Sequence, residues 1–385
     1  MNLLFVHDGP IYYDQNGNYY EYAYHGLYER YSYLGEHIYF LMRTSPIEAN
    51  TNNTILTNKV KVISVPNING ISLYLKNIME AKKIIKRAVG QADILVARGG
   101  SYSAIAIEYA KKNHISYIFE CVGCSWDAFW NHSLKGKIVA PYLFLRDKRL
   151  VKNSPYVCYV TNEFLQRRYP TTGKSVSCSN VFITPVENSV LERRIEKIHT
   201  LKKTQKIVIG TAAAIDVKYK GQEYVIKAVK KLTNKGFDLE YRMAGGNQHH
   251  SNYLFELAKS LGVSDRVKYV GSLNQDEMRE FYDSLDIYIQ PSKQEGLPRA
   301  VIEAMSRGIP VAGSDIAGIP ELLQKQFLFR KGNVNEIARI LEFMMNADLS
   351  DVARENFIKA KQYEIDVITK RRNSFYDVFL RENII

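Results

Sequence analysis

Cysteine is scarce in this 385-residue sequence, with four residues at positions 121, 124, 158 and 178. So low a content excludes a disulfide scaffold. Cys121 and Cys124 form a CxxC pair, which in other proteins is a redox site or half of a zinc site, but no second CxxC completes a metal site. We therefore expect four reduced thiols, as is usual inside cells.

Long apolar runs are also missing. No stretch approaches the roughly 18–20 uninterrupted apolar residues that span a bilayer, so we do not expect an integral membrane protein. The first residues, MNLLFVHDGP, lack the basic segment and the longer apolar segment of a signal peptide. These features predict a cytoplasmic protein.

Two ligand-binding motifs are absent from the sequence. No D-x-D occurs, which leaves a metal-bridged diphosphate site without support. No G-x-G-x-x-G follows the first predicted strand, which argues against a dinucleotide-dependent oxidoreductase. We therefore expect the protein to act without a metal or an organic cofactor.

Cations outnumber anions, 52 to 40, which gives a formal net charge of +12. Two segments, 74–89 and 135–152, concentrate positive charge. Such segments are often solvated faces, but attraction to anionic lipid headgroups or to a phosphate-bearing acceptor is the alternative. No nucleic-acid-binding motif is present. The cations are Lys76, Lys82, Lys83, Lys86, Arg87, Lys135, Lys137, Arg146, Lys148, Arg149 and Lys152.

The length suits two domains, and both halves alternate short apolar runs with amphipathic segments. This alternation is typical of parallel sheets covered by helices, so the predicted fold class is α/β. We place one domain at 1–188, a second at 189–365, and a C-terminal helix at 366–385 that packs back on the first domain. The charge-rich segment 186–206 predicts a linker or surface segment.

The helix predicted at 74–89 carries one apolar stripe at three- and four-residue spacings. We expect the whole stripe to pack on the sheet, with the cations of the segment facing outward. The stripe consists of Leu75, Ile78, Met79, Ile85 and Val89.

The most informative segment is 292–323, SKQEGLPRAVIEAMSRGIPVAGSDIAGIPELL. A predicted strand ends just before it, and Pro298 suits the first turn of a helix. Gly296 lets the backbone approach a ligand, and the N–H groups near Gly296 and Leu297 lie where a helix N-terminus favours phosphate oxygens. Glu303 follows Glu295 by eight residues, a spacing that carries weight only in this setting, and carboxylates placed here can accept the hydrogens of ligand hydroxyls.

This block resembles the retaining GT-B glycosyltransferases of family GT4, whose donor domain carries an E-x7-E motif in this setting. The resemblance implies two Rossmann-like domains facing a cleft, with the second holding a nucleoside-diphosphate sugar. It also implies that Glu303 binds the ribose and that Glu295 contacts the transferred sugar.

A second block, IGTAAAIDVKYKGQEYVIKAVKKL at 209–232, supports the resemblance. Gly210 and Thr211 stand where a diphosphate-contacting turn is expected, and Lys220 precedes a helix-opening glycine. In the family an Arg stands five or six residues before that Lys, where this chain has Ala214 and Ile215, so Lys218 is our candidate for the second charge. Gly271, after another strand, is expected to frame the base.

The resemblance is weaker in the first domain, which is expected to hold the acceptor. The family's His after the strand SYIFEC has no counterpart, because the nearest, His114, precedes that strand. Our cleft candidates fall in a glycine turn or at predicted strand ends, and for the charged ones a structural role is the alternative. These candidates are Gly17, Arg98, Glu120 and Asp127.

The function predicted from these patterns is transfer of a sugar, with retention of configuration, from a UDP- or GDP-linked donor to a saccharide acceptor. The resemblance points to capsule or O-antigen assembly, with a lipid-linked acceptor and peripheral attachment to the inner face of the membrane. Two alternatives stay open: a nucleotide-sugar epimerase of the same fold, and a non-catalytic sugar-nucleotide-binding or scaffold protein.

Overall fold

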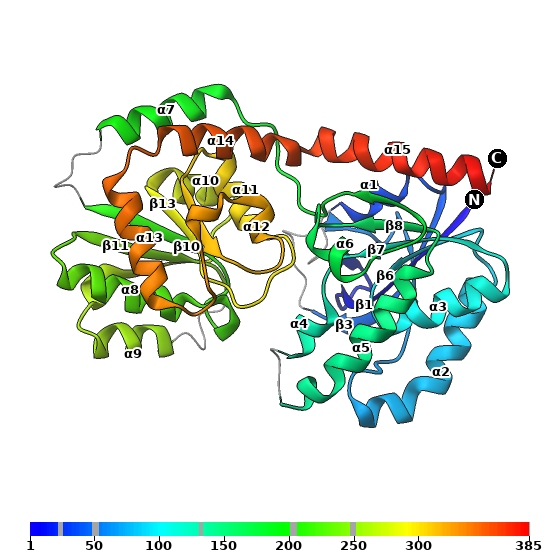
Figure 1. Cartoon of the computed structure of the whole chain (residues 1–385). Helices are drawn as coiled ribbons and strands as arrows, with labels where there is room; N and C mark the ends of the chain where they lie inside the picture. The colour runs from blue at the N-terminus through cyan, green and yellow to red at the C-terminus, as the bar shows by residue number, and fades with distance from the viewer. Residues whose placement is uncertain (22–25, 48–53, 131–133, 201–205, 247–251, 385) are drawn as a thin grey trace. The chain divides into compact units, whose positions relative to one another are not determined.

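The structure is a computed structural model that describes all residues except 22–25, 48–53, 131–133, 201–205, 247–251 and 385 (Figure 1). The chain divides into two compact units. One comprises Met1–Trp126, Val139–Cys178 and Thr369–Ile385, and the other comprises Asp127–Ile138 and Ser179–Ile368. The division after Cys178 lies before the boundary expected at residue 188.

The first unit is built on a nine-stranded, mostly parallel sheet. The long strand β1 pairs in parallel with β3 and β6 and antiparallel with β2. The first-unit strands are β1 Asn2–Tyr13, β2 Tyr19–Glu21, β3 His37–Pro46, β4 Thr54–Ile55, β5 Lys61–Ser64, β6 Ile94–Arg98, β7 Ser116–Cys121, β8 Tyr156–Tyr159 and β9 Lys174–Ser177. Every residue of β6 is buried, as expected for a central parallel strand covered on both faces.

Helices pack against this sheet through apolar side chains. They are α1 Leu27–Tyr31, α2 Ile71–Val89, α3 Ser101–Lys112, α5 Leu134–Lys152, α6 Phe164–Arg168 and, from the C-terminus, α15 Ile365–Asn383. The short helix α4 Ser125–Trp130 has no buried residue, and Asp127–Ile138 belongs to the other unit. Phe375, Tyr376 and Phe379 of α15 lie in the same core as Leu3 and Phe5 of β1. The C-terminal helix therefore completes a core begun by the first strand.

The stripe expected on α2 packs only in part. Ile85 and Val89 are buried, but Leu75 and Met79 are 73% and 75% exposed. The buried face runs instead through Ala81, Ile85 and Ala88 in the second half of the helix. The expectation that the whole stripe packs on the sheet was therefore wrong for the first half of α2.

The second unit has a six-stranded, fully parallel sheet in the order β12-β11-β10-β13-β14-β15. Its strands are β10 Ile207–Ala212, β11 Leu239–Ala244, β12 Val267–Gly271, β13 Ile287–Gln290, β14 Val311–Ser314 and β15 Leu328–Phe329. The chain proceeds outward from β10 in one direction, then returns to β13 and proceeds outward in the other. This reversal is the switch point at which doubly wound sheets bind ligands.

The helices of the second unit surround this sheet (Figure 1). They are α7 Asn188–Thr200, α8 Gln222–Asn234, α9 Asn252–Ser260, α10 Gln275–Ser284, α11 Arg299–Ser306, α12 Ile319–Leu322, α13 Val334–Asn346 and α14 Ser350–Ala360. Residues of α8, α9 and α13 share one core with the strands. The two parallel-sheet α/β units expected from the sequence are thus confirmed.

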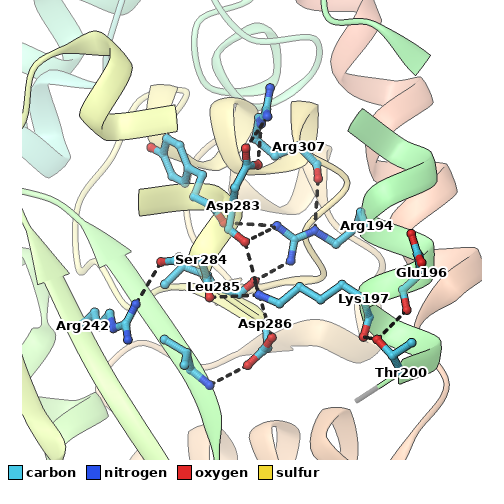
Figure 2. Close-up of polar contacts among 12 residues, drawn as sticks. Arg194, Glu196, Lys197, Thr200, Arg242, Asp283, Ser284, Leu285, Asp286 and Arg307 are labelled. Carbon is cyan, nitrogen blue, oxygen red and sulfur yellow. Dashed lines mark hydrogen bonds and ion pairs between the residues drawn. The ribbon is translucent and has the colours of Figure 1, made fainter. Parts of the chain in front are cut away.

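The segment expected to be a linker contains an anchored helix, α7. Figure 2 shows Arg194 and Lys197 of α7 directed at the end of α10. Arg194 donates to the carbonyls of Tyr282 and Leu285 at 3.2 and 2.5 Å. Lys197 donates to the Leu285 carbonyl and pairs with Asp286, both at 2.9 Å. These bonds satisfy carbonyls that the end of a helix leaves without intrahelical partners.

Two of the cleft candidates form a buried ion pair in the first unit. Arg98 Nε lies 2.8 Å from Glu120 Oε2, and both side chains are about 5% exposed or less. Arg98 also donates to the Tyr31 hydroxyl at 3.1 Å. Burial alone would raise the pKa of Glu120, but the Arg98 and Arg30 guanidinium groups hold that pKa at about 2. The assignment of Arg98 and Glu120 to an accessible cleft was therefore wrong.

Replacing one partner of this pair should destabilise the fold strongly. Glu120→Gln leaves the Arg98 charge buried without its counterion, which typically costs about 3–5 kcal/mol. The midpoint of urea unfolding, followed by circular dichroism, should fall accordingly. In the wild type, the contribution of Glu120 should be present above the ordinary carboxyl pKa and be lost as pH falls toward 2.

The exposed pair Glu108–Lys112 provides the control, since both side chains are 62% exposed. Glu108→Gln should leave the midpoint nearly unchanged, because exposed pairs contribute little. If both substitutions shifted the midpoint equally, the buried Arg98–Glu120 pair would contribute no more to stability than the exposed pair, which would contradict this prediction.

Candidate functional site

The candidate site lies where β10 and β13 end side by side. Gly210 of β10 pairs with Tyr288 of β13, so the loops that follow the two strands leave the same edge of the sheet. The loops are in contact, since Lys293 N donates to the Tyr219 carbonyl at 2.7 Å. Gly221 packs so closely that an added Cβ would lie 2.2 Å from the Pro291 oxygen. Residues 213–221 and 291–298 therefore form one surface.

Glu295 lies in the second loop and is held by three donors on a single oxygen. Its Oε1 accepts from Lys220 Nζ at 2.7 Å, from Ser292 Oγ at 2.7 Å and from Gln290 Nε2 at 3.1 Å. Gln290 and Ser292 are buried, whereas Lys220 and Glu295 are 20% and 10% exposed. The carboxylate is thus held through Oε1, and its second oxygen, Oε2, takes no part in these three hydrogen bonds.

Glu303 lies on α11, which begins at Arg299 after Pro298. Its Oε2 accepts a hydrogen bond from the Tyr282 hydroxyl at 2.9 Å. Burial raises the pKa of Glu303, while Tyr282 and Arg299 oppose this rise. A partly buried carboxylate with one donor retains acceptor capacity for a ligand hydroxyl.

The turn before α11 presents backbone donors. The Gly296 carbonyl accepts from Gly318 N at 2.9 Å, which fixes this turn against the start of α12. Within the described chain, the N–H groups of Gly296 and Leu297 donate to no acceptor. Unpaired N–H groups just before a helix are suited to binding phosphate oxygens.

Three lysines carry the positive charge of this surface. Lys220 pairs with Glu295, and Lys218 lies over the Tyr253 ring with its Nζ 5.5 Å from the centroid. Lys293, which the sequence analysis did not single out, pairs with Glu223 at 3.2 Å. The Arg that the family pattern would place near position 215 is replaced by Ile215, whose side chain is fully buried.

The two predicted turn residues of the first block lie inside a strand. β10 continues to Ala212, and the Thr211 side chain is fully buried. Thr211 Oγ1 donates to the Ile289 carbonyl at 2.7 Å and accepts from Tyr241. Gly210 is needed for packing, because an added Cβ would lie 2.4 Å from Leu285. The prediction that Gly210 and Thr211 form a diphosphate-contacting turn was therefore wrong.

The three remaining predicted site residues, Gly271, Gly17 and Asp127, lie in different parts of the fold. Gly271 ends β12 with a φ of +94°, and its carbonyl accepts from Gly245 N at 2.9 Å, so it lies at the same edge of the sheet. Gly17 is exposed in the turn between β1 and β2, where its N–H donates to the Asp14 carbonyl at 3.1 Å. Asp127 lies in the short helix α4.

The cysteines are buried free thiols. Burial raises the pKa of Cys121 well above its ordinary value, which suits an unreactive thiol. In the described part of the chain, no group of three or more His, Cys, Asp or Glu side chains has the arrangement of a metal site.

Residues 192–363 match the family described as glycosyl transferases group 1. The chain is 30% identical over 351 residues to Protein CapJ of Staphylococcus aureus, covering 89% of this chain and 85% of CapJ. It is 26% identical over 209 residues to the capsular polysaccharide biosynthesis glycosyltransferase CapM of the same species, covering 51% of this chain and 52% of CapM.

Solved structures with the same fold include HepE of Anabaena, determined in complex with UDP. It superposes with a TM-score of 0.67 at 16% sequence identity, covering 98% of this chain and all of the HepE chain. At this identity the likeness concerns the fold.

The contact between Gly221 and Pro291 yields a prediction about stability. Gly221→Ala should lower the melting temperature more than Gly236→Ala. Both glycines have a positive φ, +78° and +90°, so both substitutions strain the backbone. Only at Gly221 does the new Cβ meet another backbone atom, whereas nothing lies within 4 Å at Gly236. Equal shifts in differential scanning calorimetry would argue against close contact of the two loops.

Proposed function

The chain belongs to the glycosyl transferases group 1 family and is a glycosyltransferase, and on this basis we propose that it transfers a sugar from a nucleoside diphosphate to a saccharide acceptor with retention of configuration. The acceptor we propose is lipid-linked, in the assembly of a capsule-type or O-antigen-type polysaccharide. The named relative CapM supports this class of pathway. The UDP bound in HepE supports a nucleotide-sugar donor, and we propose that this donor is UDP- or GDP-linked.

One observation carries the proposal: two carboxylates flank the start of α11 at the switch point of a doubly wound sheet. In our assignment Glu303 accepts the ribose hydroxyls and Glu295 accepts a hydroxyl of the transferred sugar. The N–H groups of Gly296 and Leu297 face the phosphates. Burial raises the pKa of Glu303, and the Tyr282 hydroxyl and the Arg299 guanidinium offset this rise only in part.

The chemistry depends on stabilising the leaving group. As the glycosidic bond breaks, the bond electrons move to the diphosphate, whose negative charge grows. Lys220 Nζ gives one hydrogen bond to Glu295 and has two further hydrogens for phosphate oxygens. A departing phosphate oxygen then takes the proton of the acceptor hydroxyl, and that hydroxyl attacks from the same face. The product retains the configuration of the donor.

Lys220 and the helix N-terminus supply positive charge at the phosphates, so we propose that turnover needs no metal ion. The direct test is incubation with a panel of UDP- and GDP-sugars, with release of UDP or GDP measured with and without EDTA. We expect turnover of at least one donor in EDTA. Interconversion of the sugar without nucleotide release would favour the epimerase, and binding without either reaction would favour the non-catalytic alternative.

Lys220 and Lys218 form a matched pair for the same assay. Lys220→Ala should lower kcat by about 100-fold or more, the size of one lost transition-state donor. Lys218→Ala should cost much less, because Lys218 lies over Tyr253 whereas Lys220 joins the Glu295 site. Equal losses would contradict the assignment of Lys220 to the phosphates.

We further propose that the first unit binds the cytoplasmic face of an anionic membrane through α2. Ile71, Leu75 and Met79 are 73–77% exposed and follow each other at four-residue spacing, so they share one face. Lys82 and Lys86 lie seven and eleven residues after Leu75 and continue that face. Apolar side chains followed by cations suit insertion among lipids with anionic headgroups.

Helix α5 resembles α2 in having exposed apolar side chains among its cations. Tyr142 and Leu145 of α5 are 68% and 64% exposed. Among the described residues, none of the helices is both long and apolar enough to span a bilayer. The exposed apolar side chains of α2 and α5 support attachment to the surface of the membrane, where a lipid-linked acceptor would be presented.

Co-sedimentation with phosphatidylglycerol-containing vesicles tests this surface. The wild type should pellet with them and not with pure phosphatidylcholine, and high salt should weaken but not abolish the binding, because apolar side chains contribute. Leu75→Ser with Met79→Ser should reduce binding. Ile358→Ser, at a 64% exposed position in the second unit, should not. Binding that is unaffected by the α2 pair would assign the membrane contact elsewhere.

A further inference from the structure

A series of hydrogen bonds leads to Glu295, and in each of them the donor gives its hydrogen to the next group in the direction of the Glu295 carboxylate. We propose that Gln290 and Ser292 are positioning residues for the transferred sugar: they fix Glu295 through Oε1, so that Oε2 alone is presented to the sugar. The inference rests on the proposed function, since it concerns how that donor site recognises a sugar.

This series of hydrogen bonds begins at a backbone N–H group, which sets the direction in which the later groups donate. Ala212 N donates to the Tyr288 hydroxyl oxygen at 3.2 Å, and the Tyr288 hydroxyl donates to Gln290 Oε1 at 2.7 Å. Because Oε1 of the Gln290 amide accepts this proton, its Nε2 is turned toward the loop. Nε2 donates to Ser292 Oγ at 2.9 Å and to Glu295 Oε1 at 3.1 Å.

Ser292 completes the chain. Its Oγ accepts from Gln290, so its single hydroxyl hydrogen is available to Glu295 Oε1, 2.7 Å away. The Ser292 carbonyl in turn accepts from Ser314 Oγ at 2.6 Å, which holds the loop to β14. Tyr288, Gln290 and Ser292 are all buried, with exposed fractions of 0–1%. Water does not compete for these bonds.

With Lys220 included, Oε1 of Glu295 accepts three hydrogen bonds. A carboxylate oxygen with three donors has little capacity for another. A sugar hydroxyl is therefore directed to Oε2, in one orientation set by the buried amide and hydroxyl. The same geometry favours donors whose sugar carries a hydroxyl, rather than a deoxy carbon, at the position that meets Glu295.

The inference separates sugar recognition from nucleotide binding. Ser292→Ala and Gln290→Leu should each lower kcat/KM for the nucleotide-sugar by about 10- to 100-fold, the usual effect of a misplaced reacting group. Their affinity for the free nucleoside diphosphate should be unchanged in calorimetry, because no sugar is present to meet Glu295. The probes are UDP and UDP-glucose, or GDP and GDP-mannose if the wild type uses guanosine donors. Ser292→Thr, which keeps the hydroxyl, should restore activity.

A double-mutant cycle with Glu295→Ala gives the sharper result. If Ser292 and Gln290 act through Glu295, adding either substitution to Glu295→Ala should cause no further loss of kcat/KM. Parallel loss of nucleoside diphosphate affinity, or an additive loss in the cycle, would overturn the inference and assign these residues a general structural role. Absence of turnover by the wild type with every donor would instead contradict the proposed function.

Discussion

The parallel pairing of β10 with β13 is the constraint on which the donor half of this protein depends. It is the point where the strand order reverses, so two loops far apart in sequence leave the sheet as neighbours. Gly210 makes this approach compatible with the Leu285 side chain, and Gly221 lets the first loop lie against Pro291 of the second. The Lys220–Glu295 pair depends on these two close contacts, because it joins one loop to the other.

The sequence was most informative where local chemistry and register coincide. The strand, the loop containing Glu295, the proline before the helix and Glu303 all lie between Ile287 and Glu303, and local rules of helix initiation suffice to order them. The doubly wound fold was predictable for the same reason, since alternating apolar runs report parallel strands directly. Lys220 was found because it precedes a glycine that opens a helix.

Other features depended on tertiary packing, which local patterns do not encode. Gly210 and Thr211 were mistaken for a turn because the strand extends two residues further than its apolar run suggested. Arg98 and Glu120 end neighbouring strands, and only the pairing of β6 with β7 shows that they face each other in a buried site. Leu75 and Met79 fit a helical stripe, but nothing in that stripe indicates where the supporting core ends. No pattern in the sequence singles out Gln290 and Ser292, and only the fold shows that both are buried and donate to Glu295.

The attachment of α7 has a consequence for how the chain tolerates sequence change. Arg194 and Lys197 hold α10 through main-chain carbonyls of residues 282–285, not through side chains there (Figure 2). Every amino acid supplies such a carbonyl, so substitutions at the receiving positions leave the acceptors in place. On the donor side, loss of the Arg194 guanidinium or the Lys197 ammonium would leave several carbonyl acceptors without their partner at once. These bonds therefore make no demand on the side chains at 282–285, whereas they depend on the side chains of Arg194 and Lys197. Asp286, which pairs with Lys197, is a receiving position where the side chain also matters.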